Sequence, residues 1–355
     1  HGGGNYALTL PVGGIVQPLV AGGLPEAPET KRRFKNLMDV TGLSGELSMQ
    51  TAPPCTEDEL IRVHPVDFIN KFQELSAANG GELGLRTPFL KGGYDIAALS
   101  AGLSRSALCD VLSGKLKNAY ALSRPPGHHC LPDWPNGFCL LANLAVAIEA
   151  AKAQGLARRF AVIDWDVHHG NGTEHIFYDR DDVLTISIHE ENNYPINSGN
   201  LADKGRDAGL GYNMNIPLPP GAGHASYLET MDKLVLPALD RFQPDVIIIA
   251  CGFDAGIFDP LGHQLCTADT FRQMTRRVVE AAERLCGGKL MMAHEGGYSE
   301  AYVPFCGHAV MEEMSGSQIT APDPMAEVLA ALQPSLRAQA FVSGLIDEMV
   351  VEFFG

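Results

Sequence analysis

The stretch that decides the fold is Ala161-Val-Ile-Asp-Trp-Asp-Val-His-His-Gly-Asn-Gly172, where an apolar segment runs directly into carboxylates, imidazoles and glycines. Its apolar start predicts a buried strand. The stretches at 244–254 (PDVIIIACGFD) and 289–298 (KLMMAHEGGY) also lead from an apolar strand into polar residues. Ligands of open parallel sheets bind beyond the carboxyl ends of the strands, so these three stretches predict a functional site at that edge.

Strands and helices alternate along much of the chain, which predicts an α/β protein with a parallel β-sheet flanked by helices on both faces. The sequence contains neither a linker nor an internal repeat, so we expect residues 1–355 to form a single domain. Strands are expected at 118–125, 159–166, 183–189, 212–219, 244–254 and 289–295, and helices at 56–75 (broken at Pro65), 92–112, 140–155, 225–242 and 270–285.

The 355 residues carry a formal net charge of −16, and the pI is about 5.1. An acidic surface lacks the basic patch that nucleic acid or an anionic membrane requires, so neither is expected as a partner. Acidity would attract cationic substrates such as polyamines, although net charge mainly reports solubility. No apolar run reaches the roughly 18 residues of a membrane-spanning helix.

The eight cysteines form no CxxC pair, and several lie in apolar runs. They are typical of buried thiols in a reducing compartment, which predicts a cytoplasmic location and no disulfide frame. The sequence starts at His1 without a methionine, so a preceding segment, including a targeting peptide, stays open.

Asp164, Asp166 and His168 project to one side of an extended segment, because side chains alternate there. Two carboxylates so close together require a shared cation or a strong hydrogen-bond network. Asp254 follows the most apolar strand, where an N-cap is the main alternative role. Asp166, His168 and Asp254 together have the composition of an open catalytic zinc site, although such ligands also admit iron(II) or manganese.

Two further motifs carry groups suited to catalysis. In Arg124-Pro-Pro-Gly-His-His129, a rigid turn presents adjacent histidines that suit general acid–base work, with a structural pair as the alternative. In Glu295-Gly-Gly-Tyr298, the glycines allow a turn that can aim the phenol into the site. A phenol can donate a hydrogen bond to a developing oxyanion, but this turn alone is a weak signal.

Taken in order, RPPGHH, DWDVHHGNG, GFD and EGGY resemble the metal-dependent histone deacetylase family and its bacterial relatives, the histone deacetylase-like and acetylpolyamine amidohydrolases. The resemblance runs from about residue 30 to 320 and is closer to the class II branch, which has Asn after HHG. It implies an arginase/deacetylase-like fold and hydrolysis of an N-acyl amide such as acyl-lysine. It also implies one Zn²⁺ per chain, held by Asp166, His168 and Asp254.

The resemblance implies roles for further residues. His129 would be the general acid–base, with His128 as its electrostatic partner, oriented by Asp164. Tyr298 would polarise the scissile carbonyl. Asn171 stands where class I enzymes have an Asp that orients the second histidine. The acyl channel would be lined by Gly137, Phe138 and Tyr194, and Leu261 would be its gatekeeper.

Structural potassium ions are also implied. The first would use Asp164, Asp166, His168, Ser187 and Ile188, and the second Phe177, Arg180, Val183 and Tyr212. The resemblance further implies a first strand of the fold before His1, and a homo-oligomer, as in many bacterial relatives.

Several functions stay open. A peptide or small-molecule N-acyl amine is the expected substrate, with an acetylpolyamine as the alternative. Leu261 lacks the carboxylate that would favour a polyamine cation, whereas the acidic surface favours one weakly. A ureohydrolase of the arginase type would need two manganese ions and more paired carboxylates. A catalytically silent acyl-lysine-binding module is disfavoured, because every position that the chemistry requires is filled.

Overall fold

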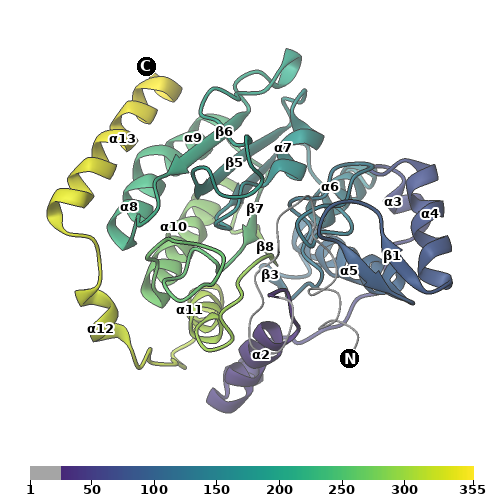
Figure 1. Cartoon of the computed structure of the whole chain (residues 1–355), viewed down its shortest axis with the longest axis horizontal. Coiled ribbons are helices and arrows are strands. Elements are labelled where there is room, and N and C mark those ends of the chain that lie inside the picture. Colours follow the sequence, from purple (N-terminus) through teal and green to yellow (C-terminus); the bar gives the residue numbers. More distant parts are fainter. Residues whose placement is uncertain (1–24) are drawn as a thin grey trace.

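The computed structural model describes residues 25–355, and its centre is a six-stranded sheet with only parallel neighbours (Figure 1). The strands are β3 (Asn118–Ala121), β4 (Phe160–Asp164), β5 (Val183–Glu190), β6 (Asn213–Leu218), β7 (Val246–Cys251) and β8 (Leu290–His294). Each strand overlaps a stretch where the sequence predicts one. Their order across the sheet is β3-β8-β7-β4-β5-β6.

Helices cover both faces of the sheet, which confirms the predicted α/β class (Figure 1). One face packs against α8 (His224–Thr230), the π-helical turn Met231–Val235, α9 (Leu236–Phe242), α10 (Ala268–Cys286), α11 (Val303–Ser315) and α13 (Leu336–Phe354). The opposite face packs against α5 (Gly93–Leu112), α6 (Asn143–Ala153) and α7 (Asn171–Phe177).

The central strand β4 shows why its sequence is continuously apolar. Ala161 and Ile163 belong to the core on the α10 side, whereas Phe160 and Val162 belong to the core on the α6 side. All five residues of the strand are buried. A strand that is covered on both faces cannot alternate apolar and polar residues, so its periodicity is lost.

A smaller group of elements lies beside α5 and α6 (Figure 1). It contains α3 (Glu57–Leu60) and α4 (Val66–Ala77), separated at Pro65 as the sequence predicts. It also contains an antiparallel pair that the sequence analysis does not predict, β1 (Gly80–Glu82) and β2 (Pro88–Leu90). The loop between β1 and β2 bonds to residues 135–138, which brings it to the functional edge of the sheet.

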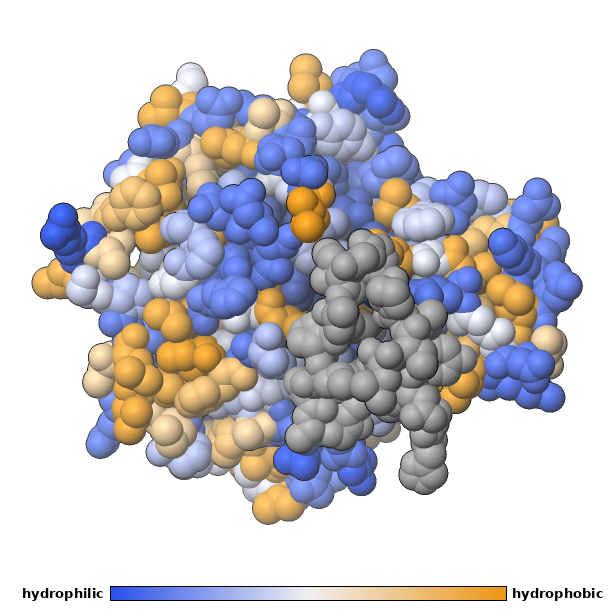
Figure 2. Space-filling view, in the orientation of Figure 1, coloured by the Kyte–Doolittle hydropathy of each residue, from blue (hydrophilic) through white to orange (hydrophobic). Residues whose placement is uncertain are grey.

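The remaining described elements lie at the periphery, where α2 (Glu29–Thr41) packs on α11 and α12 (Ala326–Ala331) leads into α13 (Figure 1). Figure 2 shows apolar residues in the region of α11 and α12, and Val328 and Leu332 are exposed there. All eight cysteines are free thiols. No helix within residues 25–355 has both the length and the apolar character to cross a membrane.

The strand order creates a switch point between β4 and β7. From β4 the chain adds β5 and β6 on one side, and β7 and β8 then fill the other side. Loops that leave neighbouring strands at such a point diverge, which opens a crevice at the carboxyl edge of the sheet. The predicted metal ligands follow these two strands, so the topology brings them together across the crevice.

Candidate metal centre and active site

The predicted metal ligands meet at the switch point. Asp166 and His168 lie in the loop after β4, and Asp254 lies three residues beyond β7. The Nδ1 atom of His168 lies 3.0 Å from Oδ1 of Asp166 and 3.1 Å from Oδ2 of Asp254. All three residues are buried, and one ligand atom from each lies within 4.8 Å of the other two. This geometry suits a single metal ion bound by two carboxylates and an imidazole.

Backbone amides fix the orientation of both carboxylates. Gly296 N–H donates to Oδ2 of Asp166 at 2.8 Å, and Val167 N–H donates to Oδ1 of Asp254 at 2.8 Å. A Cβ at position 296 would lie 2.1 Å from Oδ2 of Asp254, so only glycine fits there. The EGGY glycine therefore allows β8 to approach the metal ligands.

The electrostatics of the three ligands call for a cation. Burial alone would lower the pKa of His168, but its hydrogen bonds with Asp166 and Asp254 raise it to about 10. Burial and the charge of Asp166 raise the pKa of Asp254 to about 6. Without a metal, a proton on His168 offsets the carboxylates, and a divalent ion would take over that role. The donor set therefore fits a dication.

The histidine pair lies beside this centre. His128 and His129 have ring centroids 3.9 Å apart. Nδ1 of His128 lies 2.9 Å from Oδ2 of Asp164, and Nδ1 of His129 lies 2.8 Å from Oδ1 of Asn171. An amide or carboxylate oxygen can only accept, so each Nδ1 carries the proton. Nε2 of His129 is then free to act as a base when the ring is neutral.

The two histidines differ in charge because their partners differ. Burial opposes protonation of His128, but the negative charges of Asp166 and Asp164 hold its pKa well above the usual range. Burial and the neighbouring His128 and His168 hold the pKa of His129 well below its usual range. The surroundings thus raise the pKa of His128 and lower that of His129, and the lowered pKa suits His129 to the role of a general base.

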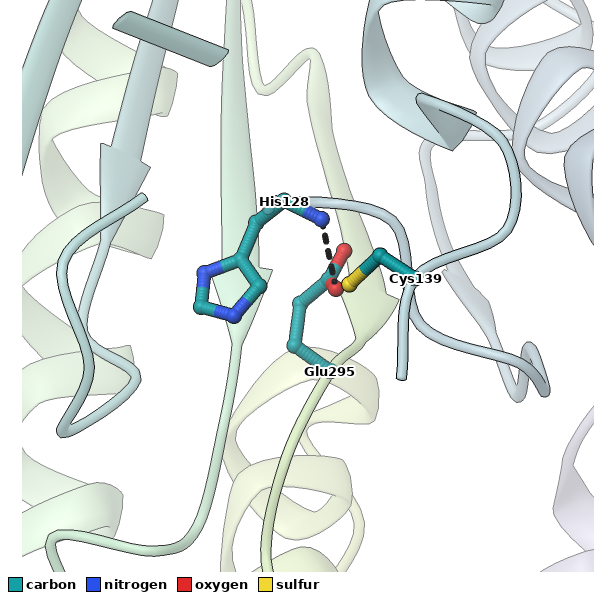
Figure 3. A group of neighbouring side chains, drawn as sticks. All are labelled: His128, Cys139 and Glu295. Carbon is teal, nitrogen blue, oxygen red and sulfur yellow. Dashed lines mark hydrogen bonds between the residues drawn. The ribbon is translucent and has the colours of Figure 1, made fainter. Parts of the chain in front are cut away.

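Glu295 has a positioning role that the sequence analysis did not assign. Its Oε2 accepts the backbone N–H groups of Gly127 at 2.7 Å and His128 at 3.1 Å, which fixes the histidine loop to the end of β8. Figure 3 shows this contact, with the His128 ring extending away from the Cys139 thiol. The side chains of these three residues also lie close together; Oε2 of Glu295 is used by the two amides, whereas its Oε1 is buried without a hydrogen-bond partner among the described residues. The sequence feature that could have pointed to Glu295 is its position directly after the buried strand β8.

The predicted substrate-binding residues line one small cavity of about 80 Å³ that reaches the histidines. The Phe138 ring lies 5.8 Å from the Tyr298 ring, and the Tyr194 ring lies 5.0 Å from the His129 ring. A Cβ at position 137 would lie 2.3 Å from the His129 ring, so Gly137 lets the wall approach the base closely. The lining consists of Arg86, His129, Gly137, Phe138, His168, Asn193, Tyr194, Leu261 and Tyr298.

Asp259 supports two residues of this cavity and was also not singled out from the sequence. Its carboxylate accepts the backbone N–H of Tyr298 at 2.7 Å and that of Leu261 at 2.9 Å. The Tyr298 hydroxyl keeps its proton, because burial and the charge of Asp254 hold its pKa well above the usual range. Tyr298 is therefore a hydrogen-bond donor at neutral pH.

The predicted potassium ligands fall into two places along β4, β5 and β6. Asp164 pairs in register with Ser187, beside the metal centre. At the other end of the sheet, the Phe177 carbonyl accepts Arg180 N–H at 3.0 Å, and the Tyr212 carbonyl accepts Thr185 N–H at 2.9 Å. The Tyr212 carbonyl also accepts the Thr185 hydroxyl at 3.4 Å, so an ion there would have to share or displace that contact. Both potassium sites stay predictions.

Fold and site together define a parallel α/β protein with a buried Asp-His-Asp centre beside a histidine pair and a tyrosine. The histone deacetylase domain family matches residues 24–314, and the chain therefore belongs to the histone deacetylase family. Membership supports amide hydrolysis with a metal ion, and an N-acyl compound as the substrate.

Individual relatives agree with this membership. The chain is 52% identical over 353 residues to the histone deacetylase-like amidohydrolase of Pseudomonas aeruginosa, which covers 99% of this chain and 93% of that protein. It is 36% identical to a probable deacetylase of Archaeoglobus fulgidus, over 84% of each chain. The crystal structure of the HDA15 HD domain matches with a TM-score of 0.80 and 32% identity, over 95% of this chain and 92% of that one. The last match confirms the predicted arginase/deacetylase-like fold.

Proposed function

We propose that the protein is a zinc-dependent amidohydrolase that removes acyl groups from acyl-lysine or related N-acyl amines. A zinc ion held by Asp166, His168 and Asp254 would polarise the amide carbonyl and acidify a water molecule. Membership of the histone deacetylase family supports metal-dependent amide hydrolysis, and the zinc ion, the acyl-lysine substrate and the roles of the individual residues are added to it.

The residues of this chain would act in sequence around the acyl group. Phe138 and Tyr194 wall the channel that admits the amide. Nε2 of His129 takes a proton from the attacking water. Tyr298 donates a hydrogen bond to the oxyanion as it develops. A histidine of the pair then protonates the leaving amine, and the charge of His128 favours the anionic transition state.

The observation that carries the proposal is the meeting of three functions in one cavity. A buried site for a cation, a neutral histidine with its Nε2 unprotonated, and a protonated phenol all border the same 80 Å³ space. Acyl transfer to water needs these three groups within reach of one carbonyl.

The direct test is turnover of a fluorogenic acetyl-lysine peptide by the metal-loaded protein. We expect hydrolysis, loss of activity with a chelator, and recovery on adding zinc. Metal analysis should give one zinc per chain. Two manganese ions per chain would instead support the ureohydrolase alternative, and absence of turnover at full zinc loading would support a silent acyl-lysine-binding module.

A side-by-side comparison of kcat/KM separates the remaining substrates. Acetyl-lysine peptide, trifluoroacetyl-lysine and acetylputrescine share the scissile amide but differ in acyl group and in charge. A preference for acetylputrescine would favour the acetylpolyamine amidohydrolase alternative, which the net charge of −16 supports.

Three accompanying features belong to the same proposal. Two structural potassium ions would bind at the sites described above. A homo-oligomer is supported by exposed apolar side chains on α12 and α13, among them Val328, Leu336 and Phe341, and light scattering would test it. The free thiols fit a cytoplasmic location.

A further inference from the structure

Arg86 is the permanently charged side chain in the lining of the substrate cavity. The lining within the described residues contains no Asp or Glu, although the whole chain has 42 acidic and 26 basic residues. The Arg86 guanidinium carbon lies 5.0 Å from the centroid of the Tyr194 ring, which forms one wall of the channel. The cavity is therefore locally positive at this wall, in a protein that is negative overall.

The backbone of Arg86 adopts a φ angle that is unfavourable for a residue with a side chain. Its φ is +60°, in the left-handed region that costs a residue with a Cβ roughly 1–2 kcal/mol. Its carbonyl accepts the N–H of Phe138 at 3.1 Å, and the neighbouring Leu85 carbonyl accepts the N–H of Gly137 at 3.0 Å. The β1–β2 loop thus builds the channel wall, and its strained position carries a long cationic side chain where glycine would fit better. Strain of this kind tends to occur at binding sites.

The guanidinium is incompletely paired. Its Nε is buried without a hydrogen-bond partner in the described part of the chain. Among residues 25–355, no carboxylate lies within the 4.0 Å of an ion pair with Arg86. By comparison, Arg180 is held by both Glu149 and Asp182. Arg86 therefore has donors available, and stacking on Tyr194 limits the directions in which they point.

We propose that Arg86 is a specificity-determining residue that selects N-acyl amines whose amine portion carries a carboxylate, such as the α-carboxylate of a C-terminal acyl-lysine, over neutral and cationic acyl amines. A guanidinium binds a carboxylate through two parallel N–H···O bonds, which a neutral amide cannot reproduce. The cationic chain of an acylpolyamine would instead be repelled. This inference rests on the proposed amidohydrolase function and adds the charge of the preferred amine.

The test uses a pair of substrates that differ only in charge. One is a peptide ending in acetyl-lysine with a free carboxylate, and the other is the same peptide with a C-terminal amide. Acetylputrescine serves as the cationic substrate. The measured quantity is the ratio of kcat/KM for the carboxylate to kcat/KM for the amide, in the zinc-loaded full chain. We expect a ratio of about five to ten in the wild type, as for one charge-assisted contact at a half-buried site.

Three variants report on the side chain. Arg86→Lys keeps the charge and should keep the ratio above one. Arg86→Gln should bring it to about one, and Arg86→Glu should invert it and improve acetylputrescine relative to the carboxylate. Arg62→Gln is the matched control, because Arg62 is an exposed arginine outside the cavity and its loss should leave the ratio unchanged.

A measurement on the wild type covers the case in which the variants fold poorly. Raising the ionic strength should lower the ratio, because salt screens the interaction of a partly exposed ion pair. A wild-type ratio near one, or an equal ratio in the wild type and in folded Arg86→Gln and Arg86→Glu, would overturn the inference while leaving the proposed function standing. No hydrolysis of any of the three substrates would overturn the proposed function and this inference with it.

Discussion

The hydroxyl of Tyr298 offers the sharpest test of the proposed chemistry. Tyr298→Phe removes a single oxygen and keeps the ring. The centroid of this ring lies 5.8 Å from that of the Phe138 ring and 6.5 Å from that of the His168 ring. The backbone contact from Tyr298 N–H to Asp259 is also retained. The substitution therefore isolates the proton donor from the shape of the cavity.

The expected loss of kcat in Tyr298→Phe follows from the protonation state of the phenol. Because burial and Asp254 hold the pKa of Tyr298 well above 10, the hydroxyl is protonated at every pH up to about 10 and always able to donate. Loss of one donor to an oxyanion in a water-poor site costs about 10²–10³ in kcat, or roughly 2.7–4 kcal/mol of transition-state stabilisation. The KM should change much less, because the contact strengthens only as charge develops.

The assay is steady-state hydrolysis of the acetyl-lysine peptide at matched zinc loading. Tyr194→Phe is the control, since it removes the same atom from the same cavity. The Tyr194 hydroxyl donates to the side-chain oxygen of Asn136 and is not the proposed donor to the substrate carbonyl. We therefore expect kcat of Tyr194→Phe to fall by less than about tenfold. Thermal melting of both variants should show that the fold is intact.

Near-wild-type kcat in Tyr298→Phe, with zinc bound, would falsify the oxyanion role. Equal losses in the two variants would also refute the reasoning, because they would point to a general disturbance of the cavity. A large rise in KM without a fall in kcat would reassign Tyr298 to substrate binding.

Three other predictions follow from the contacts of buried polar groups. Asn171→Asp places a carboxylate at the 2.8 Å contact with Nδ1 of His129, which should raise the pKa of His129. The acid limb of the pH profile of kcat/KM should then move upward by about 1–2 pH units, and an unmoved limb would contradict the role of His129 as the base. Asp254→Asn should weaken zinc binding by more than about 100-fold, measured as metal content after dialysis, and full retention of zinc would exclude Asp254 as a ligand. Burial disfavours the charged form of His64 and lowers its pKa to about 4, and the neutral Nε2 accepts the N–H of Ala142 at 3.1 Å. The unfolded chain takes up that proton near pH 6.5, so the free energy of unfolding should fall by about 3 kcal/mol between pH 6.5 and 4, and His64→Gln should remove this part of the slope in denaturant titrations.

Much of the fold was predictable because the decisive signals are local. The continuous apolar run of β4 is what a strand covered on both faces requires, and the polar residues after it mark the carboxyl edge of the sheet. The Pro65 break between α3 and α4 likewise depends only on the chemistry of one residue. The β1–β2 pair was not predicted, since two three-residue strands leave too short a pattern.

The catalytic candidates were predictable for a related reason. Asp166 and His168 share one extended segment, and Asp254 follows a strand that had to be internal, so their types and positions alone indicated a metal site. Sequence patterns do not report contacts between distant segments. Glu295 supports the histidine loop from 167 residues away, and Asp259 holds Tyr298 across 39 residues.

The sequence by itself determined the class of fold and indicated the three candidate metal ligands, the histidine pair and the tyrosine, because each of these signals lies in a short local motif. Only the tertiary structure decided that the pKa of His128 is raised while that of His129 is lowered, because that difference comes from which groups surround each ring. It also brought Arg86 to the channel wall beside Tyr194, 108 positions further along the chain. Charge and specificity depend on burial and on neighbours in space, and these exist only once the sheet, its helices and its loops have assembled.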